Sequence, residues 1–170
     1  MSPADRLSAV ELRRLVRDVE ADVGALSRIH AQAAAVVQHS VAWTPEQQAY
    51  LAVRVHAWYT ALESILERVT RTLEGSLPSG PTSHRDLLRG FTLPLPDVRP
   101  AAISPDRLAD LADLLAFRHF FRHSYAVDLD EQRLREHASR LMRVHSPVLQ
   151  DLAAFLDIMR EWITHLEREG

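Results

Sequence analysis

Apolar residues recur at intervals of three and four along most of the chain, which is the spacing of amphipathic helices. The pattern predicts five helices, at about residues 3–39, 45–74, 105–125, 128–144 and 147–167. No useful length of sequence alternates apolar and polar residues as a half-buried strand does. Two of the predicted helices are long and most connections are short. We therefore expect an all-α, antiparallel helical bundle of about five helices, forming a single domain over residues 1–170.

Prolines mark where these helices begin. Four prolines directly follow Ser or Thr, in the pairs Ser2-Pro3, Thr44-Pro45, Ser104-Pro105 and Ser146-Pro147. Each pair is typical of an N-cap followed by the first helical residue, where the missing N–H of proline costs no hydrogen bond. The other five prolines fall between residues 75 and 103 with three glycines. They predict a long connection that contains one helical turn around residues 85–89.

Composition narrows the classes of function. No apolar run approaches the roughly 18 residues of a membrane span, and no signal-peptide pattern opens the chain, so we expect a cytoplasmic protein without membrane contact. The absence of Cys excludes thiolate zinc sites and cysteine nucleophiles. All 20 basic residues are Arg, which reflects either codon usage or selection for forked phosphate contacts. Because the net charge is −3, any phosphate contact is expected to be local.

The segment from Phe117 to Tyr125 places charge on an apolar stripe. On a wheel of about 100° per residue, Arg118, Arg122 and Tyr125 continue the stripe that begins with Leu108, Leu111 and Leu115. Charged side chains on a buried stripe are costly unless they are paired or line a cleft. Two interpretations remain open for Arg118. It either pairs with Asp110 or Asp113 across the bundle, or it lines a site with His123, which is otherwise a helix-end cation.

Histidine and arginine clusters suggest two further interpretations. His119 and His123 are four residues apart, a spacing that can place two imidazoles on one metal ion, but no Glu lies between them as in zinc proteases. We therefore expect no metal and no cofactor. Four arginines on the predicted helix 128–144 alternate with Glu131 and Glu136, and they form either a solvated face or a guide for nucleic acid. They are Arg133, Arg135, Arg140 and Arg143.

The run Arg118-His-Phe-Phe-Arg-His123-Ser-Tyr125 resembles the Arg-x-x-x-x-His-x-Tyr motif of the HEPN superfamily, and specifically of HepT-like ribonuclease toxins. Members of that family tend to carry a polar residue directly after the Arg, and here it is His119. The motif lies near the end of a long helix in an all-α bundle, as it does in this chain. The resemblance is sharp over about residues 104–130 and only architectural elsewhere.

The resemblance implies a metal-independent endoribonuclease that acts on RNA as a homodimer. In that reading His123 is the general acid–base, Arg118 holds the scissile phosphate, and His119 and Arg122 are supporting groups. Tyr125 matches the position to which a partner nucleotidyltransferase antitoxin adds AMP and so silences the toxin. Tyr125 alternatively only packs against Leu111. The main alternative function is a non-catalytic HEPN-type module that binds a nucleotidyltransferase or another defence protein, and a helical scaffold without any nucleotide link is a third.

Overall fold

The computed structural model describes residues 7–39, 42–123 and 130–169, without the side chains of His123 and Glu169. These parts are mostly helical and contain no strand, which confirms the expected all-α bundle. The helices are α1 (Ala9–His39), α2 (Pro45–Leu73), α3 (Ser83–Gly90), α4 (Leu108–His123) and α5 (Glu131–Glu169), and a short 3₁₀ helix, η2 (Pro105–Arg107), precedes α4. Within the described chain, none of these helices has the length and apolar character needed to cross a membrane.

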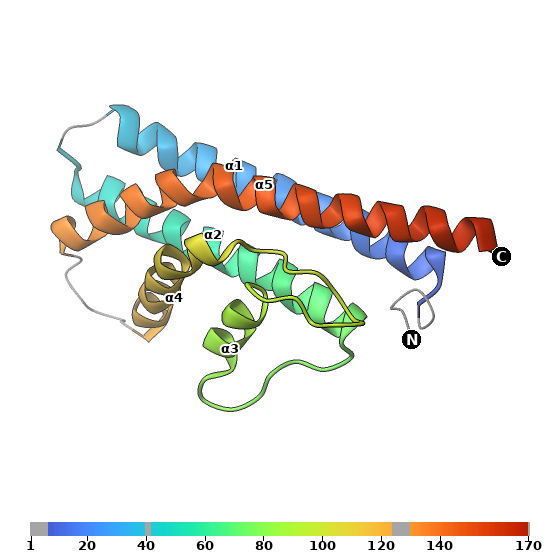
Figure 1. Cartoon of the computed structure of the whole chain (residues 1–170). Coiled ribbons are helices and arrows are strands. Elements are labelled where there is room, and N and C mark those ends of the chain that lie inside the picture. The colour runs from blue at the N-terminus through green and yellow to red at the C-terminus, as the bar shows by residue number, and fades with distance from the viewer. Residues whose placement is uncertain (1–6, 40–41, 124–129, 170) are drawn as a thin grey trace.

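Helix α2 lies at the centre of the bundle. It contacts α1, α3, α4 and α5. Figure 1 shows α1 and α5 running antiparallel along one side of α2, with α3 and α4 on the other side. Its predicted apolar stripe is buried, including Leu51, Val55, Trp58, Leu62, Ile65 and Val69. Because the other helices pack on it, α2 brings segments that are distant in sequence to one place.

The first two helices begin with capping boxes. The Thr44 hydroxyl accepts a hydrogen bond from the Gln47 N–H, and the Gln47 side chain accepts one from Thr44 N–H, as the sequence predicted for Pro45 at the first helical position. The predicted start of the first helix near residue 3 is wrong, because α1 begins at Ala9. There Ser8 and Glu11 form the reciprocal pair of bonds, which sets the helix start six residues later.

The predicted break at Ser146-Pro147 is also wrong, because α5 continues through Pro147 to Glu169. Proline inside a helix loses one backbone hydrogen bond and costs about 3 kcal/mol. The cost is offset because residues on both sides of Pro147 bury their side chains in one core. Val144 and Val148, for example, are 1% and 0% exposed. A continuous apolar face therefore outweighs the local helix-breaking signal.

The Pro-rich connection between α2 and α4 is tied down by one buried arginine. Arg99, 6% exposed, donates to Glu74 Oε1 at 2.6 Å and to the backbone carbonyls of Leu93, Pro100 and Gly90. The predicted helical turn is confirmed as α3, which is eight residues long. Ser104 was expected to cap the helix with its side chain, but its hydroxyl makes no capping bond. Instead, its backbone N–H donates a hydrogen bond to Asp151 on α5.

Candidate functional site

Arg118 is buried in the interior between α2 and α4. Only 6% of the residue is exposed, so its predicted place on the buried stripe of α4 is confirmed. Its Nη2 lies 2.6 Å from Oε2 of Glu63 on α2, a carboxylate that is itself 4% exposed. The predicted pairing with Asp110 or Asp113 is wrong. Those two aspartates instead pair with arginines of α5, 33 and 27 residues further along the chain.

Glu63 joins three helices through its two carboxylate oxygens. While Oε2 accepts from Arg118, Oε1 lies 2.7 Å from Nδ1 of His84 on α3. Thr60, one turn before Glu63 on α2, places its hydroxyl 3.4 Å from Nε of Arg118. We call Glu63, His84 and Arg118 the buried cluster. A carboxylate removed from water is stabilised only when such partners satisfy it, and here both oxygens are satisfied.

One donor of Arg118 remains unused. Its Nη1 is buried and has no hydrogen-bond acceptor among residues 7–39, 42–123 and 130–169. An unsatisfied buried donor costs about 1–3 kcal/mol, so native structures keep few of them. The guanidinium is thus held by Glu63 and Thr60, and both N–H groups of Nη1 are left to bind a further acceptor.

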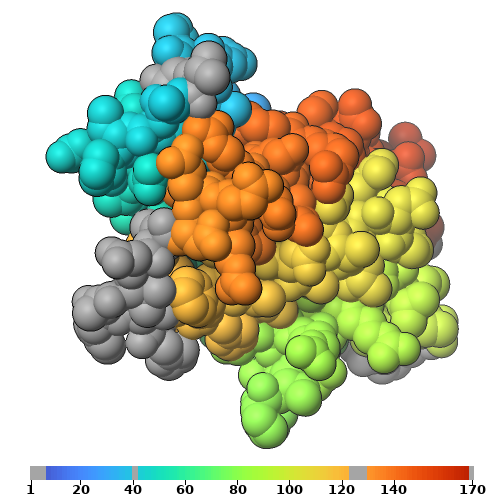
Figure 2. Space-filling model, turned by 90° about the vertical axis from the view of Figure 1, so that its left-hand side faces the viewer, coloured from blue at the N-terminus to red at the C-terminus, as the bar shows by residue number. Residues whose placement is uncertain are grey.

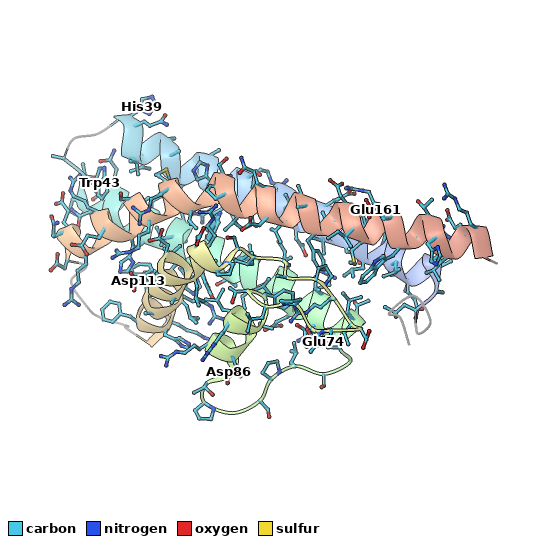
Figure 3. The ribbon with its side chains drawn as sticks, viewed as in Figure 1. His39, Trp43, Glu74, Asp86, Asp113 and Glu161 are labelled. Carbon is cyan, nitrogen blue, oxygen red and sulfur yellow. The ribbon has the colours of Figure 1, made fainter. Side chains whose placement is uncertain are left out.

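His119 lies at the outer edge of the buried cluster. It is exposed, and its ring centroid is 5.2 Å from that of His84 in an edge-to-face arrangement. Both rings line a pocket of about 390 Å³ between α3 and α4, together with Thr82, Arg85 and Asp113. In Figure 3, Asp113 on α4 and Asp86 on α3 mark the two helices that border this pocket.

Arg122 is exposed, although the wheel predicted that it continues the buried stripe. The reason is that the last turn of α4 packs through Phe121 instead. The Phe121 ring lies 5.9 Å from that of Phe117 and 5.3 Å from that of His56 on α2. Burial is the main cause that lowers the pKa of His56, and the charges of Arg118 and Arg122 lower it further.

The last two residues of the motif are only partly covered by the described structure. The backbone of His123 forms the end of α4, but its side chain lies outside the described residues, as does all of Tyr125. Positions 119 and 123 are one helical turn apart and therefore share a face of α4. That His123 and Tyr125 meet Arg118 at one site remains a prediction.

A second histidine pair lies in the core, away from the buried cluster. The rings of His30 on α1 and His145 on α5 stack at 3.8 Å, and Trp58 Nε1 donates to His145 Nδ1 at 3.1 Å. Burial, followed by the neighbouring His30, lowers the pKa of His145 to about 4. This pair fills space as neutral rings. Nowhere in the described chain do three His, Asp or Glu side chains gather as a metal site.

The arginines near the start of α5 are mostly neutralised by acidic partners. Arg135 pairs with Glu131, Arg140 with Asp113, and Arg143 with Asp110 at 2.5 Å. They line a shallow hollow of about 350 Å³ on the face that Figure 2 turns toward the viewer, where the start of α5 is orange. This arrangement confirms the solvated face and leaves little net positive charge there.

Sequence reasoning missed Glu63 and His84. The signal for Glu63 was present, because Tyr59, Glu63, Leu66 and Thr70 follow helical spacing and all are buried. A carboxylate on that second ridge of α2 is the natural partner for an arginine on a buried stripe. His84 carried no comparable signal, because only tertiary packing of the short helix α3 brings it to Glu63.

A family model described as HepT-like protein matches residues 50–159, which is more than half of the chain. The match includes Glu63, His84, Arg118 and His123. No curated protein and no solved structure matches. The family match agrees with the all-α fold and with the motif at the end of α4. The chain therefore belongs to the HepT-like protein family.

Proposed function

We propose that this protein is a ribonuclease that cleaves RNA by acid–base chemistry without a metal ion, and that it is the toxin of a toxin–antitoxin pair. The observation that carries the proposal is the state of Arg118, the first residue of the motif. It is buried, oriented by Glu63, and its Nη1 has no hydrogen-bond acceptor in the described structure. A planar guanidinium with a free donor is suited to a phosphate oxygen. Membership of the HepT-like family supports the same function.

Arg118 is assigned the role of stabilising the negative charge that develops on the phosphate in the transition state. A group fixed before the reaction needs no reorganisation when that charge appears, which is the source of much of its catalytic effect. Its Nη1 is covered by neighbouring side chains, so contact with RNA requires them to move apart. His119 and Arg122 are exposed beside it and are assigned to the RNA backbone on either side of the scissile bond.

His123 is assigned to proton transfer. Imidazole titrates near neutral pH and exchanges protons with hydroxyl groups efficiently. In RNA cleavage the 2′-hydroxyl loses its proton as its oxygen attacks the adjacent phosphorus. The bond from phosphorus to the 5′-oxygen breaks, and the 5′-oxygen gains a proton. The position of His123, one turn beyond His119 on α4, suits a group that acts beside the phosphate contacts.

A homodimer is part of the proposal. The net charge of −3 gives a single chain little general attraction for RNA, and two copies of the motif facing one cleft double the local positive groups. Phe120 is 45% exposed in the same turn of α4, which is apolar surface that a second subunit would cover.

The partner is proposed to be a nucleotidyltransferase antitoxin that adds AMP to Tyr125. Tyr125 lies two residues after His123 in the sequence, so a bulky anionic group there would occupy the RNA site and repel phosphates. Co-expression with the cognate nucleotidyltransferase is expected to raise the intact mass by one AMP per chain. Peptide mapping is expected to place it on Tyr125, and a Tyr125→Phe variant is expected to stay unmodified.

The ribonuclease is tested with purified protein and a labelled single-stranded RNA in the presence of EDTA. The wild type is expected to cleave the RNA, and His123→Ala is expected to abolish cleavage while the circular dichroism spectrum stays unchanged. Arg28→Ala serves as the control, because Arg28 is an exposed arginine on α1, away from α4. The proposal is wrong if His123→Ala cleaves RNA as fast as the wild type and the Arg28→Ala control.

The second candidate function is a non-catalytic module that binds a nucleotidyltransferase. The observation that favours it is the near-complete burial of the Arg118–Glu63 pair, which also suits a purely structural role. The two functions differ in one measurement. A binding module forms a stable complex with the nucleotidyltransferase but leaves RNA intact at every enzyme concentration and in both the dimeric and monomeric states.

A further inference from the structure

His84 has the geometry of a histidine prepared for proton transfer. Its Nδ1 lies 2.7 Å from Oε1 of Glu63. Since the carboxylate can only accept, the hydrogen in this contact is on Nδ1 of the imidazole, and the other ring nitrogen, Nε2, is left to exchange protons. A buried carboxylate behind one nitrogen fixes the tautomer and the orientation of the ring, as in other acid–base sites.

The exposed edge of His84 belongs to a pocket that suits part of an RNA chain. The His84 side chain is 34% exposed and lines the 390 Å³ pocket between α3 and α4. Arg85 lines the same pocket and forms no ion pair with any residue in the described ranges. The guanidinium of Arg85 offers hydrogen-bond donors to a phosphodiester, whereas the hydroxyl of Thr82 already donates to Asp86 Oδ2 at 2.6 Å.

The charge of the buried cluster also suits a phosphodiester. Arg118 and Glu63 cancel each other, so the cluster is neutral while His84 is neutral and carries one positive charge once His84 takes up a proton. That charge would appear next to a phosphate that carries one negative charge. The ionisable groups around His84 are the following: Glu63 on α2, Asp113, Arg118 and His119 on α4, and Arg85 on α3.

We propose that His84 is a second catalytic residue, the general base of RNA cleavage, and that the pocket between α3 and α4 binds the nucleotide whose 2′-hydroxyl is attacked. This inference rests on the proposed ribonuclease function. Nε2 of His84 takes the proton of the 2′-hydroxyl while that oxygen bonds to phosphorus. The bond from phosphorus to the 5′-oxygen breaks, and His123 donates a proton to the departing oxygen. The products are a 2′,3′-cyclic phosphate and a free 5′-hydroxyl.

The positions of the two histidines agree with this division of roles. The ring of His119 lies next to that of His84, and position 123 is one turn further along the same face of α4. His84 and position 123 therefore both neighbour His119, one from α3 and one along α4. In this proposal a phosphodiester over His119 lies between the base from α3 and the acid at the end of α4, which is the arrangement that in-line displacement at phosphorus requires.

Two substitutions at His84 separate proton transfer from structure. In His84→Asn the amide nitrogen takes the place of Nδ1, so the bond to Glu63 is kept and only the proton-accepting nitrogen is lost. In His84→Gln the amide reaches the Nε2 position but the bond to Glu63 is lost. The matched control is His39→Asn, because His39 is exposed at the end of α1. Thermal unfolding of all variants identifies any that fail to fold.

The expected result is a loss of about 10²- to 10⁴-fold in kcat/KM for both His84 variants on a dinucleotide substrate in EDTA, with no change for His39→Asn. The rate-against-pH profile of His84→Asn is expected to lose the limb that reports the base. A uridine 3′-nitrophenyl phosphate then assigns the roles, because its leaving group needs no acid. On that substrate His123→Ala is expected to regain most of the wild-type cleavage rate, whereas His84→Asn is expected to stay slow.

Three results overturn this inference. The first is a His84→Asn variant whose kcat/KM and pH profile equal those of the wild type while His123→Ala is inactive. The second is the opposite result on the nitrophenyl substrate, in which His84→Asn cleaves at close to the wild-type rate and His123→Ala stays slow. His84 is then not the general base. Products with a 3′-phosphate alone and no cyclic intermediate exclude attack by the 2′-hydroxyl. By contrast, a wild type that cleaves neither substrate refutes the ribonuclease function itself.

Discussion

At the scale of single residues, the buried Arg118–Glu63 pair is expected to dominate the stability of the α2–α4 contact. Both side chains are at most 7% exposed, so removing one partner leaves an uncompensated charge in the interior. Arg118→Ala is therefore expected to lower the free energy of unfolding by about 3–5 kcal/mol, measured by urea titration. Arg28→Ala, which removes an exposed arginine, is expected to change it by less than about 0.5 kcal/mol.

The double variant Glu63→Gln/Arg118→Met removes both charges together. It is expected to recover most of the stability lost in Arg118→Ala, because neutral side chains of similar size cost far less to remove from water than an unpaired charge. Full loss of stability in the double variant would show that packing, and not charge, holds the two helices together. The double variant also matters for function, since it separates loss of RNA cleavage from loss of folding.

The stacked pair of His30 and His145 predicts how stability depends on pH. Burial and the neighbouring His30 lower the pKa of His145 to about 4, below the 6.5 of an unfolded chain. The unfolded state therefore binds more protons between pH 6.5 and 4, so stability is complete above pH 6.5 and is lost as the pH falls through that range. Burial also lowers the pKa of His30, His56 and His137, and these three add to the effect in the same direction.

Urea titrations at several pH values between 4 and 7.5 measure this dependence. His145→Asn keeps an acceptor for Trp58 Nε1 and cannot titrate, so its stability is expected to fall less steeply below pH 6.5 than that of the wild type. If the free energy of unfolding falls equally steeply with pH in both proteins, His145 does not contribute to the pH dependence of stability. At pH 7.5 both forms of residue 145 are neutral, and comparison there isolates the change in packing.

At the scale of elements, the sequence predicted helices well where one local signal and one apolar stripe agree. Thr44, Pro45 and Gln47 place the start of α2 correctly, because the capping box is complete within four residues. The errors arose where tertiary packing outweighs a local signal, as at Pro147. The residues of the candidate site follow the same rule. Arg118 follows from its place on a stripe, whereas His84 depends on how α3 folds back on α2, for which no periodicity exists.

Two substitutions at Ser146-Pro147 test whether α5 is one continuous helix or two helices, because the two interpretations predict opposite changes in stability. In a continuous helix, Pro147→Ala restores an N–H that can bond to the carbonyl of Arg143, and it is expected to stabilise the fold by about 1–2 kcal/mol. Ser146→Ala is expected to be neutral or slightly stabilising. If Ser146 were an N-cap, the same substitution would cost about 1 kcal/mol. Urea titration of both variants decides between a continuous helix and two helices.

At the scale of the whole molecule, charge is arranged locally. The 20 arginines are outnumbered by 23 acidic residues, and Arg135, Arg140 and Arg143 of α5 are paired with carboxylates. Arg85 lines the pocket between α3 and α4, Arg118 is buried against Glu63, and Arg122 is exposed one turn after Arg118 on α4. A nuclease built in this way would hold RNA through a few contacts and not through a broad basic surface.

This arrangement predicts a weak dependence of RNA binding on salt. Two to four neutralised phosphates, from one subunit or two, give a slope of log K against log salt of about −1.5 to −3, because a single strand contributes about −0.7 per phosphate. The slope is measured by fluorescence anisotropy with a 2′-O-methyl RNA, which binds but lacks the attacking hydroxyl. Arg85→Ala is expected to reduce its magnitude. Arg143→Ala is expected to leave it unchanged, since Asp110 already neutralises that arginine. A slope steeper than about −5 that weakens in Arg143→Ala would instead place the RNA along α5.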